Sequence, residues 1–530
     1  CHFMSRTARN SLKLSFFTML SRVLGLVRDH FQATFFGTGA VAAAWEIAYM
    51  LPNMLRNLLA EGVLSQAFIP IYGQALKEGD EKGREAAGAV IAVLALFLTG
   101  LVATAILIFP FFIPLYVDQD PAQAGLEIYL SQVLFGFILS ASLTAILSGI
   151  AQTHQHFSFP ALSPILLNLV FIAGFLILRP LDLTQEGNAS ALAWIVLGGG
   201  FLQIVLQAGY VYFHGWWPRL KLAWKHPALR KVLTLMAPAV LGASLFHINQ
   251  LMDIVLASYL IDDTGAIPGL RFAHRLIQLP TGIIGVALST AILPTLVAAM
   301  KSDGSDDNGQ ELVGAISFSL FLTVPAGLGL YLLGPFIIHL LFSGGEWTVD
   351  STLTTWHALQ FYCIGVPFYS MNRILTSSFF AYQDTKTPVR IMAATVAVNL
   401  SLNLILIPFL AHGALALSTS TTSFLNCMAL LFFLRKKIHR IPWSDLAGRV
   451  QALLPLWIAL AGVVALSVFF LGGLDFWQLG DPELIRSSLE SRSRVWPVVF
   501  GSIGLGGIIY LLSALIMRNR EMGVIRSLFR

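Results

Sequence analysis

Six basic residues lie inside the apolar runs of the sequence, away from the loops. A charge at the centre of a membrane helix costs about 2.5 to 3.5 kcal/mol on insertion scales, so such side chains are expected to face a polar cavity. A guanidinium group stays charged when it is dehydrated, and its planar fork binds phosphate oxygens bidentately. All six residues are arginines, and we predict that they bind an anionic substrate: Arg22, Arg28, Arg56, Arg271, Arg275 and Arg373.

Snorkelling at the ends of spans would explain any one of these arginines. It explains six poorly, because Arg22 and Arg275 lie well inside their apolar runs. A proton relay or an exporter of amines would instead require acidic residues. We identify only four in the runs, so the predicted cavity is cationic: Asp29, Glu46, Glu61 and Asp253.

The spacing of polar residues in the eighth apolar run predicts one wall of this cavity. Positions i, i+3, i+4 and i+7 share one helix face. Pro280 and Gly282 follow the stripe, at a point where a helix can bend, and Pro52 similarly precedes Arg56 in the second run. The residues of the stripe are Arg271, His274, Arg275 and Gln278. In the first run, the i+7 spacing of Asp29 from Arg22 suggests that the two pair.

A second polar cluster could bind a small hard cation such as Na⁺. Asn249 and Asp253 are spaced i, i+4 in the seventh run, and Asn399 and Asn403 are spaced likewise in the eleventh. One carboxylate with amide oxygens suits such an ion. Hydrogen bonding between helices by asparagine is the alternative, and composition alone favours it.

These residues lie on elements that the composition places in a membrane. Of the 530 residues, 56% are hydrophobic and only 12% are charged, with a mean hydropathy of +0.74. A soluble protein of this length needs more polar surface, so a water-soluble enzyme is excluded. The runs predict an all-α polytopic protein of fourteen transmembrane helices, at 11–35, 40–76, 87–116, 127–151, 161–178, 189–213, 228–260, 267–299, 311–342, 352–381, 389–410, 413–434, 447–472 and 494–517.

Lysine and arginine are distributed unevenly over the loops between these spans. Sixteen lie on one side and four on the other, and the basic residues of both ends agree with the richer side. The positive-inside rule therefore predicts cytoplasmic N- and C-termini. The net charge of +5 follows from this topology and does not indicate nucleic acid as a partner.

The remaining sequence features give few further signals. Cys1-His2-Phe3 precedes Met4 and is interpreted as a remnant of cloning. The three cysteines indicate neither a disulfide framework nor a metal centre.

Two sequence echoes indicate an internal repeat. Residues 65–70 resemble 289–294, about 224 positions later, and 151–160 resemble 381–388 at a similar offset. An even number of helices per repeat gives both halves one orientation, which predicts two six-helix lobes around a central cavity, a transporter architecture. Chance similarity of apolar sequence is the alternative. The predicted divisions are an N-terminal segment 1–10, lobes at 11–226 and 227–440, and two extra helices within 441–530.

Several motifs resemble those of the MviN/MurJ family, the lipid II flippases of the multidrug/oligosaccharidyl-lipid/polysaccharide exporter superfamily. The likeness covers essentially all fourteen spans, and its first-span and Gln-Asp-x-Lys-Thr-Pro motifs are specific. The matching stretches are 21–29 (SRVLGLVRD), 51–56 (LPNMLR), 60–70 (AEGVLSQAFIP), 278–288, 293–294 and 383–388 (QDTKTP).

The resemblance implies movement of lipid II, an undecaprenyl pyrophosphate that bears a disaccharide-pentapeptide, across the bacterial inner membrane. It implies essential arginines at Arg22, Arg28, Arg56 and Arg275, and a gate carboxylate at Glu61, beside which Asp29 and Glu46 are the other gate candidates. It also implies that the last two helices form a groove for the lipid tail. A sodium site, where the family has one, maps onto Asp253, Asn399, Asn403 and Thr419, although Asn403 stands where Asp is common.

The arginines, the loop lengths and the resemblance favour one of three possible functions. Lipid II flipping by alternating access is favoured, with membrane lipids and other cell-wall synthesis proteins as expected partners. A cation-coupled exporter of drugs or of other polyprenyl-linked oligosaccharides is the alternative within the superfamily, and six arginines disfavour a drug exporter. A membrane glycosyltransferase should show a catalytic carboxylate and a metal site in a sizeable polar loop. The longest loop has about 20 residues, so we predict that the chain is not an enzyme and needs no cofactor, with Na⁺ as a candidate coupling ion.

Overall fold

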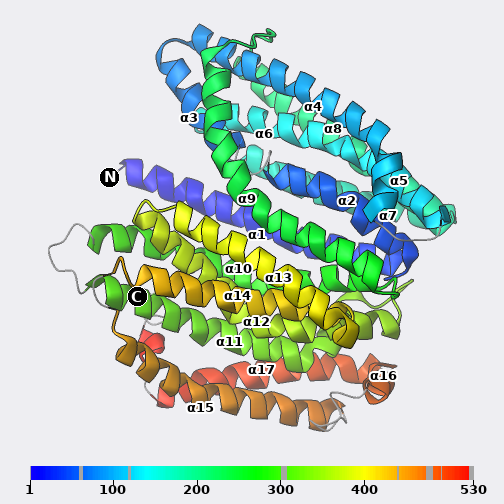
Figure 1. Cartoon of the computed structure of the whole chain (residues 1–530), viewed down its shortest axis with the longest axis vertical. Coiled ribbons are helices and arrows are strands. Elements are labelled where there is room, and N and C mark those ends of the chain that lie inside the picture. Colours follow the sequence, from blue (N-terminus) through cyan, green and yellow to red (C-terminus); the bar gives the residue numbers. More distant parts are fainter. Residues whose placement is uncertain are drawn as a thin grey trace. The chain divides into compact units, whose positions relative to one another are not determined.

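The computed structural model describes residues 2–58, 64–116, 121–299, 307–438, 441–472, 482–490, 492–517 and 519–523. In this part of the chain every regular element is a helix (Figure 1). The chain divides into two compact units, one up to Tyr259 and the other from Leu260. Each unit is described separately below.

The first unit contains nine α-helices. Short polar stretches separate them, and Thr184 shows how one begins: its hydroxyl accepts a hydrogen bond from the Gly187 amide and so caps the first turn of its helix. The helices are α1 (His2–Phe36), α2 (Ala40–Leu58), α3 (Leu64–Lys77), α4 (Asp80–Tyr116), α5 (Pro121–Phe135), α6 (Phe137–Thr153), α7 (Ser163–Leu178), α8 (Gln185–Phe213) and α9 (Pro227–Leu260).

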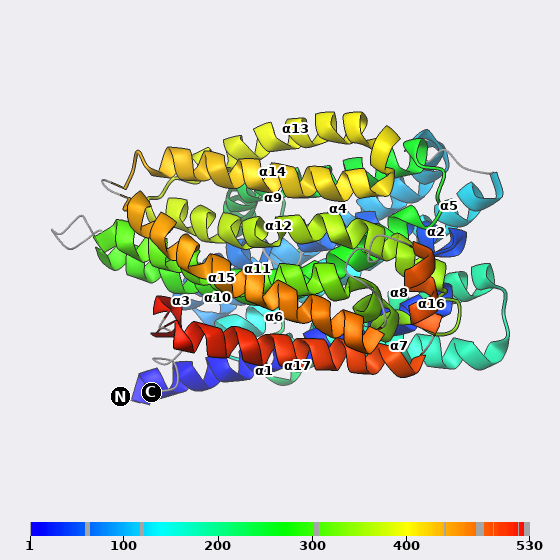
Figure 2. The same cartoon turned by 90° about the horizontal axis from the view of Figure 1, so that it is seen from below.

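The second unit contains the remaining eight. Figure 2 shows α13 and α14 side by side, and α15 beside α17. Thr348 and Ser351 form a reciprocal capping box at the start of α12. The helices are α10 (Ala266–Ala299), α11 (Asp307–Phe342), α12 (Val349–Ala381), α13 (Lys386–Leu410), α14 (His412–Leu434), α15 (Trp443–Ser467), which continues as a π-helical turn (Val468–Gly472), α16 (Pro482–Glu490) and α17 (Arg492–Ile516).

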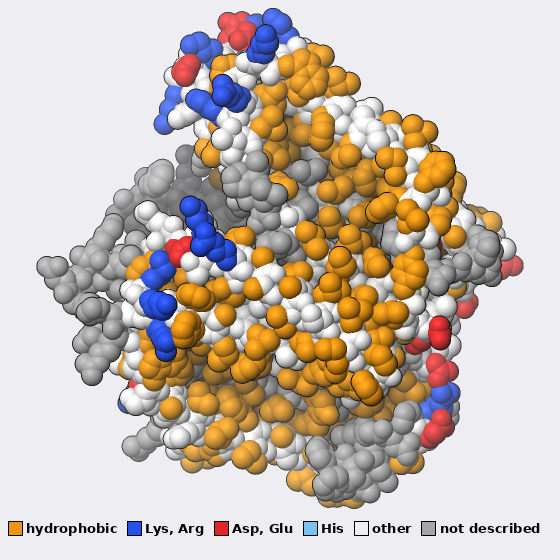
Figure 3. All heavy atoms as spheres, in the orientation of Figure 1, with side chains coloured by type: hydrophobic (Ala, Val, Ile, Leu, Met, Phe, Trp, Pro, Cys, Tyr) orange, Lys and Arg blue, Asp and Glu red, His pale blue; other side chains and the backbone are white. Residues whose placement is uncertain are grey.

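The all-helical prediction is confirmed. Each of the fourteen predicted spans coincides with one helix or with two consecutive ones: 40–76 with α2 and α3, and 127–151 with α5 and α6. Nine helical segments of the described residues are long and apolar enough to cross a membrane. A helix that crosses a membrane needs an apolar surface toward the lipid. In Figure 3 hydrophobic side chains cover most of the visible face, and charged side chains lie at its margins.

Helix ends repeat along the chain. Phe36 ends α1 and Leu260 ends α9, 224 residues later, while Thr153 and Ala381 end α6 and α12, 228 residues apart. By this offset α9 is the counterpart of α1, as the predicted boundary after residue 226 requires. Contacts nevertheless group most of α9 with the first unit, because Ala228, Val232 and Met236 are buried in its core. The assignment of α9 to the second lobe therefore stays a prediction.

Each unit has its own packed interior, which holds the helices that carry the predicted site residues. In the first, the rings of Phe36, Trp45, Phe171 and Phe175 join α1, α2 and α7. In the second, α10, α11, α12, α13 and α14 share one apolar cluster. Within that unit, α15 and α17 pack against α11 (Figure 1).

Candidate substrate-binding site

Arg28 on α1 is held by a carboxylate and by an aromatic ring. Its Nη2 lies 2.7 Å from Oδ1 of the fully buried Asp29, and its guanidinium carbon lies 5.3 Å from the ring centroid of Phe171 on α7. Asn168 of α7 donates to the Ser21 carbonyl at 3.0 Å and so ties the two helices together. The structure thus pairs Asp29 with the adjacent Arg28, whereas the sequence spacing had suggested Arg22, whose side chain is exposed.

Glu46 and Arg56 lie on α2. Nε2 of Gln32 donates to Oε1 of Glu46 at 2.6 Å, and both side chains are buried, so this candidate gate carboxylate lies between α1 and α2. Arg56 follows Pro52 on α2, and its Nη2 donates to Oδ1 of Asn53 at 2.9 Å. Glu61, the other gate candidate, lies outside the described residues.

Glu127 on α5 is an intramembrane acid that the sequence analysis missed. It is fully buried, and within the described part of the chain neither carboxyl oxygen forms a hydrogen bond. Gln123, one turn earlier, donates instead to the Ala40 carbonyl at 3.4 Å. Glu127 is the first residue of the predicted span 127–151 and was left out of the four acids, whereas the helix begins at Pro121.

The predicted polar stripe of the second unit lies on α10, which runs without a break from Ala266 to Ala299. The four residues of the stripe are partly or fully exposed, while Phe272, Ala273, Leu276 and Ile277 between them are buried against neighbouring helices. The helical face inferred from spacing is therefore the more exposed face of this part of α10. Within the stripe, Nε2 of Gln278 and Nδ1 of His274 are 3.1 Å apart.

Arg373 on α12 reaches the surface of the second unit across α10. A Cβ atom added at Gly285 would lie 3.1 Å from Cδ of Arg373, so the glycine gives the arginine's stem room to cross. The side chain of Arg373 is exposed, and none of the six predicted arginines is fully buried. Each unit thus carries three: Arg22, Arg28 and Arg56 in the first, and Arg271, Arg275 and Arg373 in the second.

The residues of the predicted sodium site divide between the units. Nδ2 of Asn403 donates to Oδ1 of Asn399 at 3.0 Å, and Nδ2 of Asn399 donates to the Thr422 hydroxyl at 3.3 Å, which joins α13 to α14. Oγ1 of Thr419, one turn before Thr422, makes no hydrogen bond within the described residues. Asp253 belongs to the first unit. The observed hydrogen bonds agree with the alternative interpretation, in which asparagine side chains form hydrogen bonds between helices.

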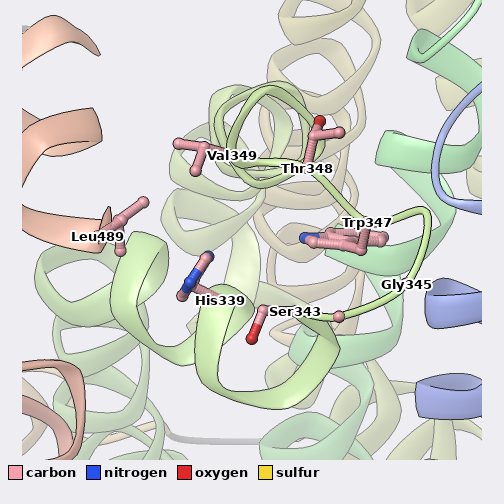
Figure 4. Close-up of a pocket in the computed structure, with 8 residues that line it drawn as sticks. His339, Ser343, Gly345, Trp347, Thr348, Val349 and Leu489 are labelled. Carbon is pink, nitrogen blue, oxygen red and sulfur yellow. The ribbon is translucent and has the colours of Figure 1, made fainter. Parts of the chain in front are cut away.

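A separate cavity of about 320 Å³ lies in the second unit, where α11 ends and α12 begins (Figure 4). His339 and Ser343 of α11, Val349 of α12 and Leu489 of α16 line it. None of the predicted site residues is among its lining. The short helix α16, which the sequence analysis did not predict, is joined to α12 by an ion pair between Arg486 and Asp350.

Two helical units with a repeated order of helix ends, each carrying three of the six predicted arginines, define a class: polytopic membrane transporters built from two helical bundles. The family model described as "Lipid II flippase MurJ" matches residues 32–476. The chain is 32% identical over 453 residues to a probable lipid II flippase MurJ of Rhizobium tropici, covering 84% of each chain. The probable lipid II flippase MurJ of Vibrio cholerae is also 32% identical, over 531 residues and 97% of each chain. The chain belongs to the lipid II flippase MurJ family.

Solved structures agree with this assignment. The structure titled "Lipid II flippase MurJ, inward closed conformation" matches with a TM-score of 0.77 and 26% identity, covering 98% of this chain and 99% of that one. An inward-facing multidrug transporter of the MATE family matches with a TM-score of 0.70 but only 13% identity, covering 83% of this chain and 99% of that one. The second likeness concerns the fold alone.

Proposed function

We propose that this chain moves lipid II from the cytoplasmic to the outer leaflet of the bacterial inner membrane by alternating access. The observation that carries the proposal is the placement of three of the six predicted arginines on the helices of each unit, in a chain of the lipid II flippase MurJ family. The pyrophosphate of lipid II is the anionic group for which guanidinium forks are suited. Both arginine sets are proposed to take part in binding it.

Pre-organised arginines make such binding less costly. Arg28 is held by Asp29 and Phe171, and Arg56 by Asn53, so little side-chain freedom is lost when phosphate oxygens replace water around them. A ligand shifts a two-state transporter only by its difference in affinity for the two states. The head group is therefore proposed to bind the inward-open state and to favour the change to the outward-open one.

The undecaprenyl tail is proposed to stay in lipid beside α15 and α17, the two helices outside the repeat. In the second unit, two hydrogen bonds one turn apart on α11 join it to α17 and to the segment that follows α17. The Tyr510 hydroxyl donates to the Phe321 carbonyl at 2.7 Å, and the Ser317 hydroxyl donates to Oε1 of Glu521 at 2.6 Å. A long apolar tail thus has a firmly placed helix pair to pack against.

The proposal also includes the orientation of the chain in the membrane, the kind of process it performs and its partners. Both termini face the cytoplasm, by the loop-charge asymmetry. The chain performs transport without covalent chemistry. Other cell-wall synthesis proteins are its partners, because the precursor must be made on one side of the membrane and used on the other.

Na⁺ is proposed as the coupling ion, bound by Asp253, Asn399, Asn403 and Thr419. With one carboxylate the affinity should be modest. Cysteines placed in the transport path should then change in accessibility to a thiol reagent when Na⁺ replaces choline, and should not do so in Asp253→Ala. Equal accessibility of the native chain in both buffers would leave Asn399 and Asn403 with a purely structural role.

Depletion of the protein in cells tests the proposal in its native membrane. Lipid II should accumulate in the cytoplasmic leaflet, where a periplasmic lipid II-cleaving toxin cannot reach it. A cation-coupled exporter of drugs, the alternative, predicts unchanged lipid II accessibility and increased drug sensitivity. An exporter of another polyprenyl-linked oligosaccharide predicts that a different lipid-linked sugar accumulates.

A further inference from the structure

The Gln-Asp-x-Lys-Thr-Pro motif forms the turn between α12 and α13. The amide of Gln383 donates to the Phe380 carbonyl at 2.9 Å, and that of Asp384 to the Phe379 carbonyl at 3.0 Å. Gln383 has a φ of 55°, in the left-handed region, which ends α12. The turn thus fixes the position of the residue that follows it, Asp384.

The Asp384 carboxylate joins the ends of three helices. Its Oδ1 accepts from the amides of Lys386 at 3.1 Å and Thr387 at 3.0 Å, which caps α13. Its Oδ2 accepts from the Thr387 hydroxyl at 2.7 Å and forms an ion pair with Nζ of Lys437, just beyond α14, at 3.1 Å. Hydrogen bonds from Thr387 and the charge of Lys437 lower the pKa of Asp384 to about 2, so the carboxylate is ionised at every physiological pH.

The first half of the chain contains the same turn with a different chemistry. Gln155 has a φ of 66°, and the amides of Gln155 and His156 donate to the carbonyls of Gln152 and Ala151, as their counterparts do 228 residues later. His156 occupies the place of Asp384. Its Nδ1 lies 2.6 Å from the hydroxyl of Tyr210 on α8, the counterpart of α14. In both halves, therefore, the residue after the left-handed glutamine bridges to the last helix of the repeat.

This joint holds the helix that carries Arg373. The exposed Arg373 is about two turns before the end of α12, and its stem crosses Gly285 of α10. A change in the direction of α12 against α13 and α14 would move the guanidinium relative to the stripe on α10. A charged pair resists such a change more strongly than the neutral contacts of a turn.

We propose that Asp384 is a positioning residue for transport: its bonds to α13 and to Lys437 keep the ends of α12, α13 and α14 together while the substrate is moved. The inference rests on the proposed function, because its consequence is measured on lipid II. It concerns turnover and not head-group affinity, since Asp384 and Lys437 lie in loops outside the membrane spans.

The test compares variants of the full-length chain reconstituted in vesicles containing lipid II. Asp384→Asn and Lys437→Gln should each slow transport by roughly five-fold, and the double variant should be no slower than either single one, because both remove the same pair. Lys437→Arg keeps the charge and should transport at close to the native rate. Lys436→Gln, a neighbouring lysine that contacts the rings of Phe432 and Phe433, is the matched control.

Two further readouts separate positioning from other roles. Binding of lipid II to the detergent-solubilised variants should keep the native affinity. Amide hydrogen exchange at Lys386 and Thr387 should speed up in Asp384→Asn whether or not the chain transports lipid II, so a failure of the proposed function would be distinguished from a failure of this inference. Native transport rates in both single variants, additive losses in the double variant, or a loss of affinity equal to the loss of rate would each overturn the proposal.

Discussion

At the scale of single residues, the arginines are distinguished by how they are held. Arg28 is fixed between a carboxylate and an aromatic ring, Arg56 by an amide oxygen, and Arg271 lies over the ring of Phe272 at 5.1 Å. Lysine at these positions could not use all of these contacts, because its ammonium group is a compact, strongly hydrated charge. The preference for arginine seen in the sequence thus has a structural counterpart.

A histidine outside the spans gives a prediction at this scale. His154 follows α6 and stacks on Trp216 at 4.1 Å, beside His156 and Tyr72. Burial, and to a smaller extent His156, lowers the pKa of His154 below its usual value near 6.5. The folded state therefore resists protonation, and its stability is complete above about pH 6.5 and falls as the pH drops through and below that value.

The melting temperature of the detergent-solubilised chain should accordingly fall between about pH 7.5 and pH 5.5. His154→Gln should reduce this fall. His226→Gln, a change just before α9 and outside the ring cluster, should leave it unchanged. If His154→Gln and the native chain lose stability in parallel, the ring cluster does not carry the acid sensitivity.

At the scale of elements, hydropathy located the helices and missed their interruptions. The predicted span 127–151 is two helices that meet at Gly136, where an added Cβ would lie 3.1 Å from Leu197 of α8. Its start was placed six residues late because Pro121, Gln123 and Glu127 reduce the local hydropathy. Contacts between helices determine where a helix begins and where it is interrupted, and a single sequence does not show those contacts.

Among the site residues, those whose signal lies within one helix could be predicted, and those that depend on contacts between helices could not. The stripe on α10 could be predicted because i, i+3, i+4 spacing is a property of one helix. The bond between Gln32 and Glu46 joins two helices and had no signal in the spacing. Asp29 illustrates the limit: helix periodicity favoured Arg22 as its partner, and the conformation of the adjacent Arg28 decided the pair.

The packing of α4 provides the prediction at this scale. The Arg219 amide donates to the Arg84 carbonyl at 3.0 Å, and a Cβ atom added at Gly88 would overlap the Arg219 carbonyl. Gly88→Val should therefore destabilise the protein by about 1 to 3 kcal/mol. Gly100→Val, on the same helix with open space around it, should be close to neutral. Thermal unfolding in detergent measures both, and equal midpoints would show that the loop simply moves away.

At the scale of the whole molecule, two units of repeated helix order each carry three of the six predicted arginines, while the turns after α6 and α12 share a backbone conformation and differ in chemistry. A repeat supplies two related halves that alternate between arrangements. Differences between the halves then assign separate tasks, such as the ionic joint at Asp384 in the second and the aromatic joint at His156 in the first.

The central claim is that arginines of both halves act on lipid II, and flipping by the purified chain tests it most directly. In vesicles with labelled lipid II in both leaflets, native protein should expose the inner pool to an external reagent much faster than protein-free vesicles do. Arg22→Ala, Arg56→Ala and Arg275→Ala should each slow this by roughly ten- to a hundred-fold, with lysine restoring only part of the rate. Native protein that exposes no inner lipid II, or alanine variants that flip it at the native rate, would contradict the account.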